Sequence, residues 1–324
     1  MRPWQEAENV PAFSQESCNI ATCNVTKING IFGETIQNIL LKKGYKLGKS
    51  IGEGSYCKVK IAYRASELGF VEKIACKVVN KKRASRDFVT KFLPREVSIV
   101  RSIRHPNIVS VCDIIESEDL VYIFMDICER GDLLDYIRAR GPLSEARTKF
   151  FFRQMVEAIS YLHSRDIAHR DLKCENVLLA GRDHLKIADF GFARWCSDLT
   201  SKKRILSETY CGSAAYAAPE ILQGVKYNPK MYDIWSLGVI LFIMISAAMP
   251  FDDGNISRLI KAQMNKKFSF PEKICVSSKV KRLVTHLLEP DVTKRATIKQ
   301  VANYTWLDDR CYSVIQATKM TFDL

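Results

Sequence analysis

The chain of 324 residues is 47% hydrophobic and 26% charged, with only 15 glycines and 10 prolines. This make-up excludes a chain dominated by disorder and a collagen-like repeat, and the length suffices for a sizeable core in one large domain or two modest ones. The net charge of +13 permits acidic partners, but the basic residues are scattered in short runs that are typical of a solvated surface. We therefore expect no nucleic acid as the primary ligand.

The first part of the chain has the pattern of a small antiparallel sheet with one helix. Residues 1–40 show no sustained period, and we expect residues 1–44 to form a flexible or loosely docked extension. From Tyr45 onward apolar residues alternate in strand-like segments, whereas Phe92, Val100 and Ile103 share one face of a helix predicted at 86–103. The predicted strands are 45–51, 58–63, 71–79, 108–115 and 121–125.

Beyond Gly131 the pattern becomes mainly helical. Ser144 can cap a long helix, because apolar residues recur at helical spacing after it. Short strands are predicted at 176–179 and 185–187, and a further helix at 233–246. The sequence thus predicts an α+β fold in which a β-rich unit of about 80 residues precedes a larger α-rich unit. Ligands tend to bind where two such units meet.

The spacing of the cysteines and the length of the apolar stretches indicate the cellular location of the protein. Eleven cysteines are spread without a pairing pattern, and no C-x-x-C occurs. No basic start precedes an apolar stretch, so we expect no secretory signal. We expect the thiols to be reduced and the protein to be cytoplasmic, with the nucleus as a second location. The uncharged stretch 234–249 is shorter than the ~18–20 residues that span a bilayer, which predicts a buried core helix and no membrane span.

A glycine-rich turn, Gly52-Glu-Gly54-Ser-Tyr-Cys57, lies between the first two predicted strands. Without a Cβ, glycine lets backbone N–H groups approach phosphate oxygens closely. A plain hairpin turn explains the two glycines equally well when they are taken alone. No helix follows the turn, which argues against a Rossmann or P-loop site and favours a hairpin that covers a ligand.

Lys77 and Glu96 are two charged residues in apolar surroundings. Lys77 lies in the middle of a predicted strand beside Ala75, where an ammonium must reach solvent or an anion. Glu96 shares the apolar face of the helix at 86–103. An ion pair between them would satisfy both charges and leave the lysine aimed at phosphate. Two unrelated side chains that reach solvent separately remain the alternative.

The strongest signal is a set of polar groups at residues 168–179 and 188–191. Asp171, Lys173 and Asn176 lie within six residues of one another, and Asp189 precedes a phenylalanine and Gly191. One aspartate can accept a hydroxyl proton, the amide and the second aspartate can hold Mg²⁺, and the ammonium can steady transferring phosphate oxygens. This set indicates phosphoryl transfer, because loops rarely collect these groups by accident.

With these residues the chain resembles a eukaryotic protein kinase over about residues 45–309. Lys173 and the Gly212-Ser213 pair are similar to serine/threonine kinases rather than tyrosine kinases. Segments 91–96, 168–176, 214–220 and 232–238 resemble the testis-specific serine/threonine kinases, which are relatives of the calmodulin-dependent group. The matching residues are, in chain order, Gly52, Gly54, Lys77, Glu96, His169, Arg170, Asp171, Asn176, Asp189, Phe190, Gly191, Ala218, Pro219, Glu220, Asp233 and Arg295.

The resemblance implies a bilobal kinase fold, with ATP and Mg²⁺ as cofactors. It implies an N-lobe at 45–126, a hinge at 127–131, a C-lobe at 132–309 and a short tail at 310–324. Lys77, paired with Glu96, would contact the α- and β-phosphates. The residues implied to cover ATP are Ile51, Gly52, Glu53, Gly54, Ser55, Tyr56, Cys57, Lys58 and Val59. Those implied around the adenine are Val59, Ala75, Leu178, the gatekeeper Met125, and the hinge residues Asp126 and Cys128.

The resemblance also assigns the chemistry. Asp171 would be the catalytic base, Asn176 and Asp189 the magnesium ligands, and Lys173 with Ser213 would bracket the reacting phosphate. Cys57 departs from the family pattern, because it replaces the third glycine of the loop. Its thiol and that of Cys128 are hypothesised to make the site sensitive to oxidants or electrophiles, and small apolar filling is the alternative role. His169, Phe190, Val111 and Val100 would form an internal stack.

Regulation and substrate choice are implied in the same way. Arg170 and Arg194 face a loop without an obvious carboxylate partner, so phosphorylation of Thr209, by an upstream kinase or by the chain itself, is expected to order that loop. Ser207 is the second choice of acceptor. Asp132 and Glu175 match positions that favour arginine upstream of the phosphorylated residue, which predicts basic protein substrates.

Two other functions remain open at the level of the sequence. A kinase-shaped scaffold without catalysis would be expected to lack one of Lys77, Asp171, Asn176 or Asp189, and all four are present. A nucleic-acid-associated protein that uses its basic surface would bind DNA or RNA with a steep dependence on salt. The likeness to the testis-specific kinases suggests a role in male germ cells.

Overall fold

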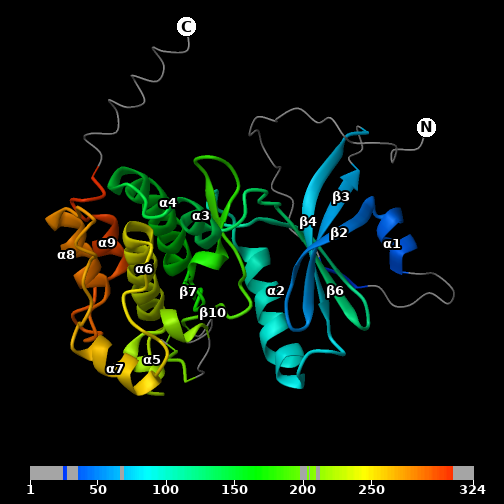
Figure 1. Ribbon diagram of the computed structural model, residues 1–324. Coiled ribbons are helices and arrows are strands. Elements are labelled where there is room, and N and C mark those ends of the chain that lie inside the picture. The colour runs from blue at the N-terminus through cyan, green and yellow to red at the C-terminus, as the bar shows by residue number, and fades with distance from the viewer. Residues whose placement is uncertain are drawn as a thin grey trace, which may run out of the picture. The chain divides into compact units, whose positions relative to one another are not determined.

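The computed structural model describes residues 25–27, 36–65, 69–197, 203, 205–208 and 212–308. These residues fold as two compact units (Figure 1). The first unit consists of the described residues up to Arg104 together with Val109–Glu129. The second consists of His105–Ile108 and the described residues from Arg130 onward.

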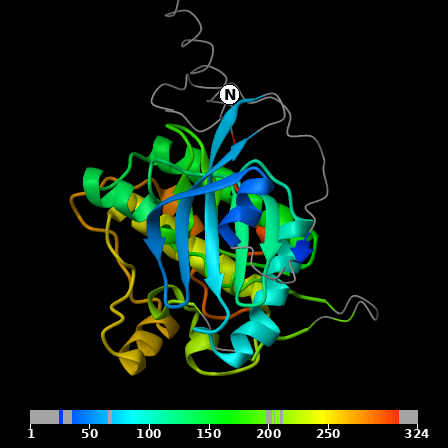
Figure 2. The same cartoon turned by 90° about the vertical axis from the view of Figure 1, so that its right-hand side faces the viewer.

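The first unit is built on a six-stranded sheet with the strand order β1-β5-β6-β4-β3-β2. Its strands lie side by side in Figure 2. Neighbouring strands are antiparallel except for β1, which pairs with β5 in parallel. The strands are β1 (Val25–Lys27), β2 (Tyr45–Glu53), β3 (Cys57–Ala65), β4 (Val71–Asn80), β5 (Val111–Glu116) and β6 (Leu120–Met125).

Part of the expected N-terminal extension belongs to this unit. Helix α1 (Ile36–Lys42) buries Leu40 in the same apolar cluster as Tyr45 and Phe124, whose rings stack with centroids 3.9 Å apart. The prediction of a flexible or loosely docked segment is therefore wrong for α1, and also for β1, which joins the sheet. A seven-residue helix and a three-residue strand are too short to produce a recognisable period.

The helix expected at 86–103 has two parts. A π-helical turn, Phe88–Phe92, leads directly into α2 (Leu93–Ser102). Pro94 occupies the first turn of α2, where its missing N–H is tolerated because that group has no partner inside the helix. The buried face of α2 carries Leu93, Val100 and also Glu96. The helix therefore brings one carboxylate into an apolar setting.

The second unit is mainly helical and holds two short hairpins. Ser144 caps α4 as predicted, since its side chain accepts a hydrogen bond from the backbone N–H of Arg147. Strand β7 (Ile167–Ala168) pairs with β10 (Arg194–Trp195), and β8 (Val177–Leu179) pairs with β9 (Leu185–Ile187). The helices are α3 (Leu133–Arg140), α4 (Glu145–Ser164), α5 (Pro219–Leu222), α6 (Pro229–Ser246), α7 (Ile256–Met264), α8 (Ser278–Leu287) and α9 (Ile298–Ala302).

Helix α6 is the core helix of the second unit. Among the described residues it alone is long and apolar enough to cross a bilayer, but 94% of that stretch is buried inside the protein. Helices α4 and α8 pack against it (Figure 1). Gly238 allows the close approach of α8, because a Cβ at this position would lie 2.8 Å from Leu287 Cβ and 2.9 Å from Leu288 Cδ2.

Replacing Gly238 with alanine is therefore expected to destabilise the protein. Overpacking a tight core costs about 1–3 kcal/mol, which exceeds the gain of about 1 kcal/mol from replacing a glycine inside a helix. We expect the Tm in a thermal unfolding experiment to fall by about 2–6 °C. Gly181→Ala is the control, because its Cβ would meet only an ordinary contact, 3.8 Å from His184 Cβ. An equal Tm for both variants would contradict the close packing of α6 on α8.

Candidate active site

The glycine-rich turn forms the tip of the β2–β3 hairpin in the first unit. Gly52 pairs with Val59, Glu53 pairs with Lys58, and the N–H of Gly54 donates to the carbonyl of Cys57 at 2.8 Å. A Cβ at position 54 would lie 2.9 Å from Cys57 Sγ. The thiol that replaces the third glycine of the family pattern therefore lies over Gly54, and the tip keeps a short hairpin form.

The predicted ion pair between Lys77 and Glu96 is confirmed. Lys77 Nζ donates to Glu96 Oε1 at 2.7 Å, and the two side chains are 15% and 4% exposed. The second oxygen of Glu96 is buried and has no hydrogen-bond partner among the described residues. Because an uncompensated buried charge is costly, this carboxylate depends strongly on Lys77. Strand β4 and helix α2 together fix the position of the ammonium.

The residues expected around an adenine lie on β3, β4 and the end of β6. Met125 pairs with Ala75 of β4, and Val59 of β3 pairs with Lys77. Asp126 exchanges two hydrogen bonds with Ser110, one through its backbone N–H and one through its carboxylate, each 3.0 Å long. The Asp126 side chain thus has a structural role. Cys128 is half-buried.

In the second unit, Asp233 holds the loop that follows β7. This carboxylate is fully buried on α6 and accepts from the backbone N–H groups of His169 at 3.0 Å and Arg170 at 2.8 Å. His163 Nε2 lies 2.8 Å from the same carboxylate. Arg170 has a φ of 65°, an uncommon conformation for a residue with a side chain. The bonds to Asp233 hold the backbone in that conformation just before Asp171.

The structure brings together four residues that were predicted to act in one site, namely Asp171, Lys173, Asn176 and Ser213. Asn176 Nδ2 donates to the backbone carbonyl of Asp171 at 2.8 Å and to its Oδ2 at 3.0 Å. Lys173 Nζ lies 3.1 Å from the same Oδ2 and donates to Ser213 Oγ at 3.4 Å. Asp171 is only 4% exposed. Its carboxylate is thus held by an amide and an ammonium, beside a hydroxyl of the later loop.

Asp189 and Asn176 have the chemistry of magnesium ligands. Asp189 is exposed, has a φ of 60°, and accepts from the N–H of Gly191 through Oδ1 at 3.4 Å. The next residue, Phe190, is buried against His169, with ring centroids 4.9 Å apart. The two hydrogen bonds from Asn176 Nδ2 leave its amide oxygen as the free acceptor, and Mg²⁺ prefers carboxylate and amide oxygens. The donor set therefore fits the expected cation.

Gly212 is a functional position whose role the sequence did not reveal. Its φ is 89°, and a Cβ there would lie 2.5 Å from the hydroxyl of Tyr232, 3.0 Å from the carbonyl of Arg170 and 3.2 Å from Asp171 Oδ1. Any side chain would press on the carboxylate at the centre of the site. In the sequence Gly212 stands out only as the glycine before Ser213, a pair similar to that of serine/threonine kinases.

Arg170 is a buried cation with spare hydrogen-bonding capacity. Its Nε donates to the carbonyl of Phe192 at 2.7 Å, and its Nη1 donates to Ser207 Oγ at 2.9 Å. Its Nη2 is buried without a hydrogen-bond partner, and no carboxylate pairs with Arg170 within the described ranges. Ser207 is fully buried. Thr209, the predicted acceptor of phosphate, lies outside the described residues. Arg194 Nε donates to the carbonyl of Trp195 at 3.3 Å.

The two carboxylates predicted to bind a basic peptide flank Cys174. Asp132 caps α3 by accepting from the N–H of Asp135 at 2.9 Å. Glu175 is exposed, and its Oε2 accepts a hydrogen bond from the hydroxyl of Tyr216 at 3.2 Å. Burial raises the pKa of Cys174 to about 12, and the nearby negative charges of Glu175 and Asp132 act in the same direction. Both carboxylates thus lie near one buried thiol.

The predicted scaffold ion pair is also present. Arg295 binds Glu220 with both ends of its guanidinium, at 2.6 and 2.9 Å, and its Nη1 also donates to the carbonyl of Met231 at 3.0 Å. Its guanidinium carbon lies 5.0 Å from the ring centroid of Trp235. These contacts tie the segment after Ser213 to α6 and to the residues that precede α9.

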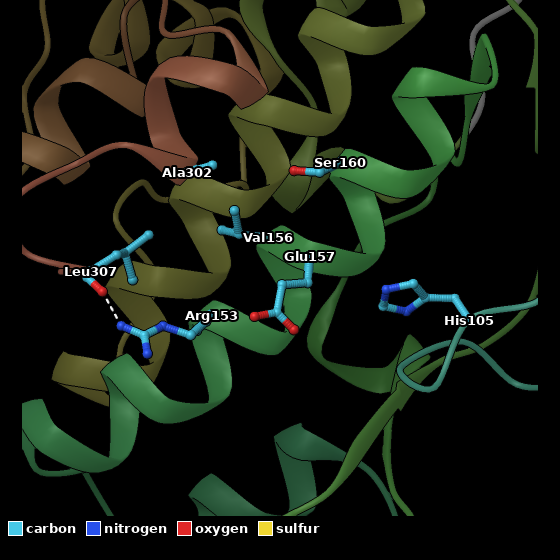
Figure 3. Close-up of a pocket in the computed structure, with 7 residues that line it drawn as sticks. All are labelled: His105, Arg153, Val156, Glu157, Ser160, Ala302 and Leu307. Carbon is cyan, nitrogen blue, oxygen red and sulfur yellow. Dashed lines mark hydrogen bonds between the residues drawn. The ribbon is translucent and has the colours of Figure 1, made fainter. Parts of the chain in front are cut away.

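A cavity of about 480 Å³ in the second unit contains none of the predicted site residues. Figure 3 shows it beside α4, where Arg153 donates to the carbonyl of Leu307. Its lining residues are His105, Arg153, Val156, Glu157, Ser160, Ala302 and Leu307.

Known proteins are similar to this chain over most of its length. Residues 45–307 match the family model described as the protein kinase domain. Testis-specific serine/threonine-protein kinase 1 of Mus musculus is 45% identical over 273 residues, which cover 84% of this chain and 74% of that protein. Testis-specific serine/threonine-protein kinase 3 of the same species is 46% identical, covering 84% and 99%. CBL-interacting protein kinase 32 of Oryza sativa subsp. japonica is 37% identical, covering 81% and 58%.

The cysteine environments predict a pattern of chemical labelling. Burial raises the pKa of both Cys174 and Cys196 to about 12, whereas Cys275 is exposed. Because the thiolate is the reactive form, we expect iodoacetamide at pH 8 to modify Cys275 at least about tenfold faster than either buried cysteine. Peptide mass spectrometry over a time course measures this. Unfolding in urea should equalise the rates, and rapid labelling of Cys174 in the folded protein would contradict the observed burial.

Proposed function

Because the chain belongs to the protein kinase family, we propose that it is an active serine/threonine kinase that transfers the γ-phosphate of ATP to hydroxyl groups of proteins. The observation that carries this proposal is the arrangement around Asp171, whose carboxylate is oriented by Asn176 and Lys173 beside Ser213. A group that must take a proton at a defined place needs such fixed orientation.

Each unit, taken by itself, has groups suited to bind a nucleotide or its metal ion. The ammonium of Lys77, held by Glu96, supplies positive charge for the α- and β-phosphates, and the backbone N–H groups of the hairpin tip can approach phosphate oxygens. Asn176 and Asp189 would hold Mg²⁺, which when bound neutralises charge on the phosphate oxygens. Lys173, next to Asp171, is placed to stabilise negative charge on the group in transfer.

The positions of these residues support a direct transfer of the γ-phosphate to the substrate hydroxyl. The oxygen of a substrate serine or threonine forms a bond to the γ-phosphorus, and the bond from that phosphorus to the β,γ-bridging oxygen breaks, so that ADP leaves with its electron pair. The proton of the attacking hydroxyl passes to the carboxylate of Asp171. Gly212 leaves room beside Asp171 Oδ1, where a side chain would otherwise interfere with the incoming hydroxyl.

Asp171→Asn tests catalysis directly. Removing the proton acceptor should lower kcat by about 10²–10⁴-fold while the fold is kept, because an amide can replace the carboxylate in most of its contacts. The measurement is ATP-dependent phosphorylation of a degenerate peptide library by the wild type and the variant, with Tm as the control for folding. A folded wild type that, phosphorylated and supplied with Mg²⁺, modifies no peptide would favour the alternative, a catalytically silent scaffold.

We further propose that phosphorylation of Thr209 activates the enzyme, either by an upstream kinase or by autophosphorylation. The supporting observation is the buried guanidinium of Arg170, which has one nitrogen without a partner among the described residues and makes no ion pair there. A phosphate dianion would supply charge-assisted acceptors for that nitrogen and so order the loop. Ser207 is a poorer acceptor of phosphate, because its hydroxyl is buried and bonded to Arg170.

Thr209→Ala should therefore lower kcat/KM by about tenfold or more, since hydrogen bonds to charged groups contribute about 1.5–3 kcal/mol each. The matched control is Thr293→Ala, an exposed hydroxyl that bonds only Asp291 within the described structure. Activity should be compared after treatment of both variants with the same activating kinase and after treatment with phosphatase. Equal activity of Thr209→Ala and the wild type would contradict the proposed activation.

The substrates and the setting follow from the same family. We propose that Asp132 and Glu175 select protein substrates with basic residues upstream of the phosphorylated serine or threonine, because arginine pairs well with carboxylates. Since the most similar relatives reported above carry testis-specific names, we propose a role in male germ cells, in sperm formation or function. A location in the cytoplasm, with the nucleus as a second site, completes the proposal.

A further inference from the structure

Tyr216 contacts Glu175, one of the two carboxylates that we propose to select basic substrates. It ends the 3₁₀ turn Ala214–Tyr216, is only 5% exposed, and its hydroxyl contacts the loop of Asp171. The hydroxyl donates to Glu175 Oε2 at 3.2 Å and lies 3.5 Å from the backbone N–H of Cys174. A buried phenol thus reaches an exposed carboxylate.

The backbone around Tyr216 is fixed from three directions. Its N–H donates to the carbonyl of Ser213 at 3.0 Å, and its carbonyl accepts from Ser236 Oγ of α6 at 3.2 Å. The carbonyl of the next residue, Ala217, accepts from the buried Gln263 of α7 at 2.9 Å. Helices α6 and α7 therefore hold the backbone that carries the phenol.

This placement matters because Glu175 would otherwise be a free surface side chain. A glutamate loses rotamer entropy worth up to about 1.5–2 kcal/mol when it is fixed, and a carboxylate that must first be ordered by its ligand binds that ligand more weakly. Here one oxygen is already bonded to the phenol, and Oε1 remains available to a guanidinium. Burial raises the pKa of Tyr216, so the phenol remains a donor at neutral pH.

We propose that Tyr216 is a positioning residue for substrate specificity, which holds the Glu175 carboxylate in the orientation that recognises an arginine upstream of the phosphorylated residue. This inference rests on the proposed kinase function and on its preference for basic substrates. The same turn carries Ser213, which bonds Lys173 beside Asp171. Recognition of the arginine and placement of the acceptor hydroxyl therefore depend on one short segment, 213–216.

The test compares Tyr216→Phe with the wild type on peptide pairs that differ only by arginine or alanine at one position, two to five residues before the serine. The ratio of kcat/KM for the arginine peptide to that for the alanine peptide should fall about threefold to tenfold, as expected when the arginine must itself order part of the Glu175 side chain. The kcat for the alanine peptide should change by less than about twofold. Tyr136→Phe is the matched control, because its hydroxyl makes no hydrogen bond within the described residues.

Glu175→Gln and the double variant separate positioning from simple damage. If Tyr216 acts through Glu175, the double variant should have the same ratio as Glu175→Gln alone, because coupled residues are not additive. A ratio that falls with Glu175→Gln and is unchanged with Tyr216→Phe would overturn the inference and leave the proposed preference intact. A uniform loss on both peptides, or additive effects in the double variant, would show a structural role and would overturn it too.

Affinity gives a readout that does not need turnover. Calorimetric titration of the same peptide pairs should show the arginine preference in Kd and its reduction in Tyr216→Phe. A wild type that binds the arginine peptide selectively but does not phosphorylate it would refute the proposed catalysis, and a lower selectivity of Tyr216→Phe would still support the role of Tyr216. A wild type without any arginine preference in either assay would refute both the substrate preference and the inference.

Discussion

The candidate site depends on one buried carboxylate. Asp233 lies fully buried on α6, and it accepts from the two backbone N–H groups that precede Asp171. Burying a charge without partners is strongly unfavourable, so the loop must bring its N–H groups to α6. That requirement holds Arg170 at a positive φ just before Asp171, whose carboxylate contacts Asn176 and Lys173.

The other buried charges follow the same rule within each unit. Lys77 and Glu96 pair in the first unit, and Glu220 and Arg295 pair in the second. Arg170 departs from this rule, because its buried guanidinium has only neutral acceptors among the described residues. A buried cation that has only neutral partners is a position where an anionic ligand or a phosphate can act. The proposed regulation rests on that distinction.

Packing around the loops decides which side chains can act. Gly212 leaves space beside Asp171 Oδ1, and Gly54 leaves space for the Cys57 thiol. Tyr216 extends from the core to an exposed carboxylate on the catalytic loop. The contact between Gly54 and Cys57 lies within one hairpin, whereas the contacts of Gly212 and Tyr216 join segments that are far apart in the chain. The proposed specificity and the proposed catalysis therefore both depend on contacts from the segment 212–216, which lies outside the loop of Asp171.

The sequence by itself determined the family, the fold class, most helices and strands, and the partners Lys77–Glu96 and Glu220–Arg295, because hydrophobic period and motif order are properties of neighbouring residues. It did not reveal α1 and β1, which are too short to show a period. Helix α1 forms because its Leu40 packs into the apolar cluster of the first unit, and β1 forms because it pairs with the edge of β5. Only the tertiary structure placed the Tyr216 hydroxyl on Glu175 and the Gly212 backbone on Asp171. Those contacts join residues about 40 positions apart, and their distances are set by the packing of α6 and α7 beneath them, which no local pattern records.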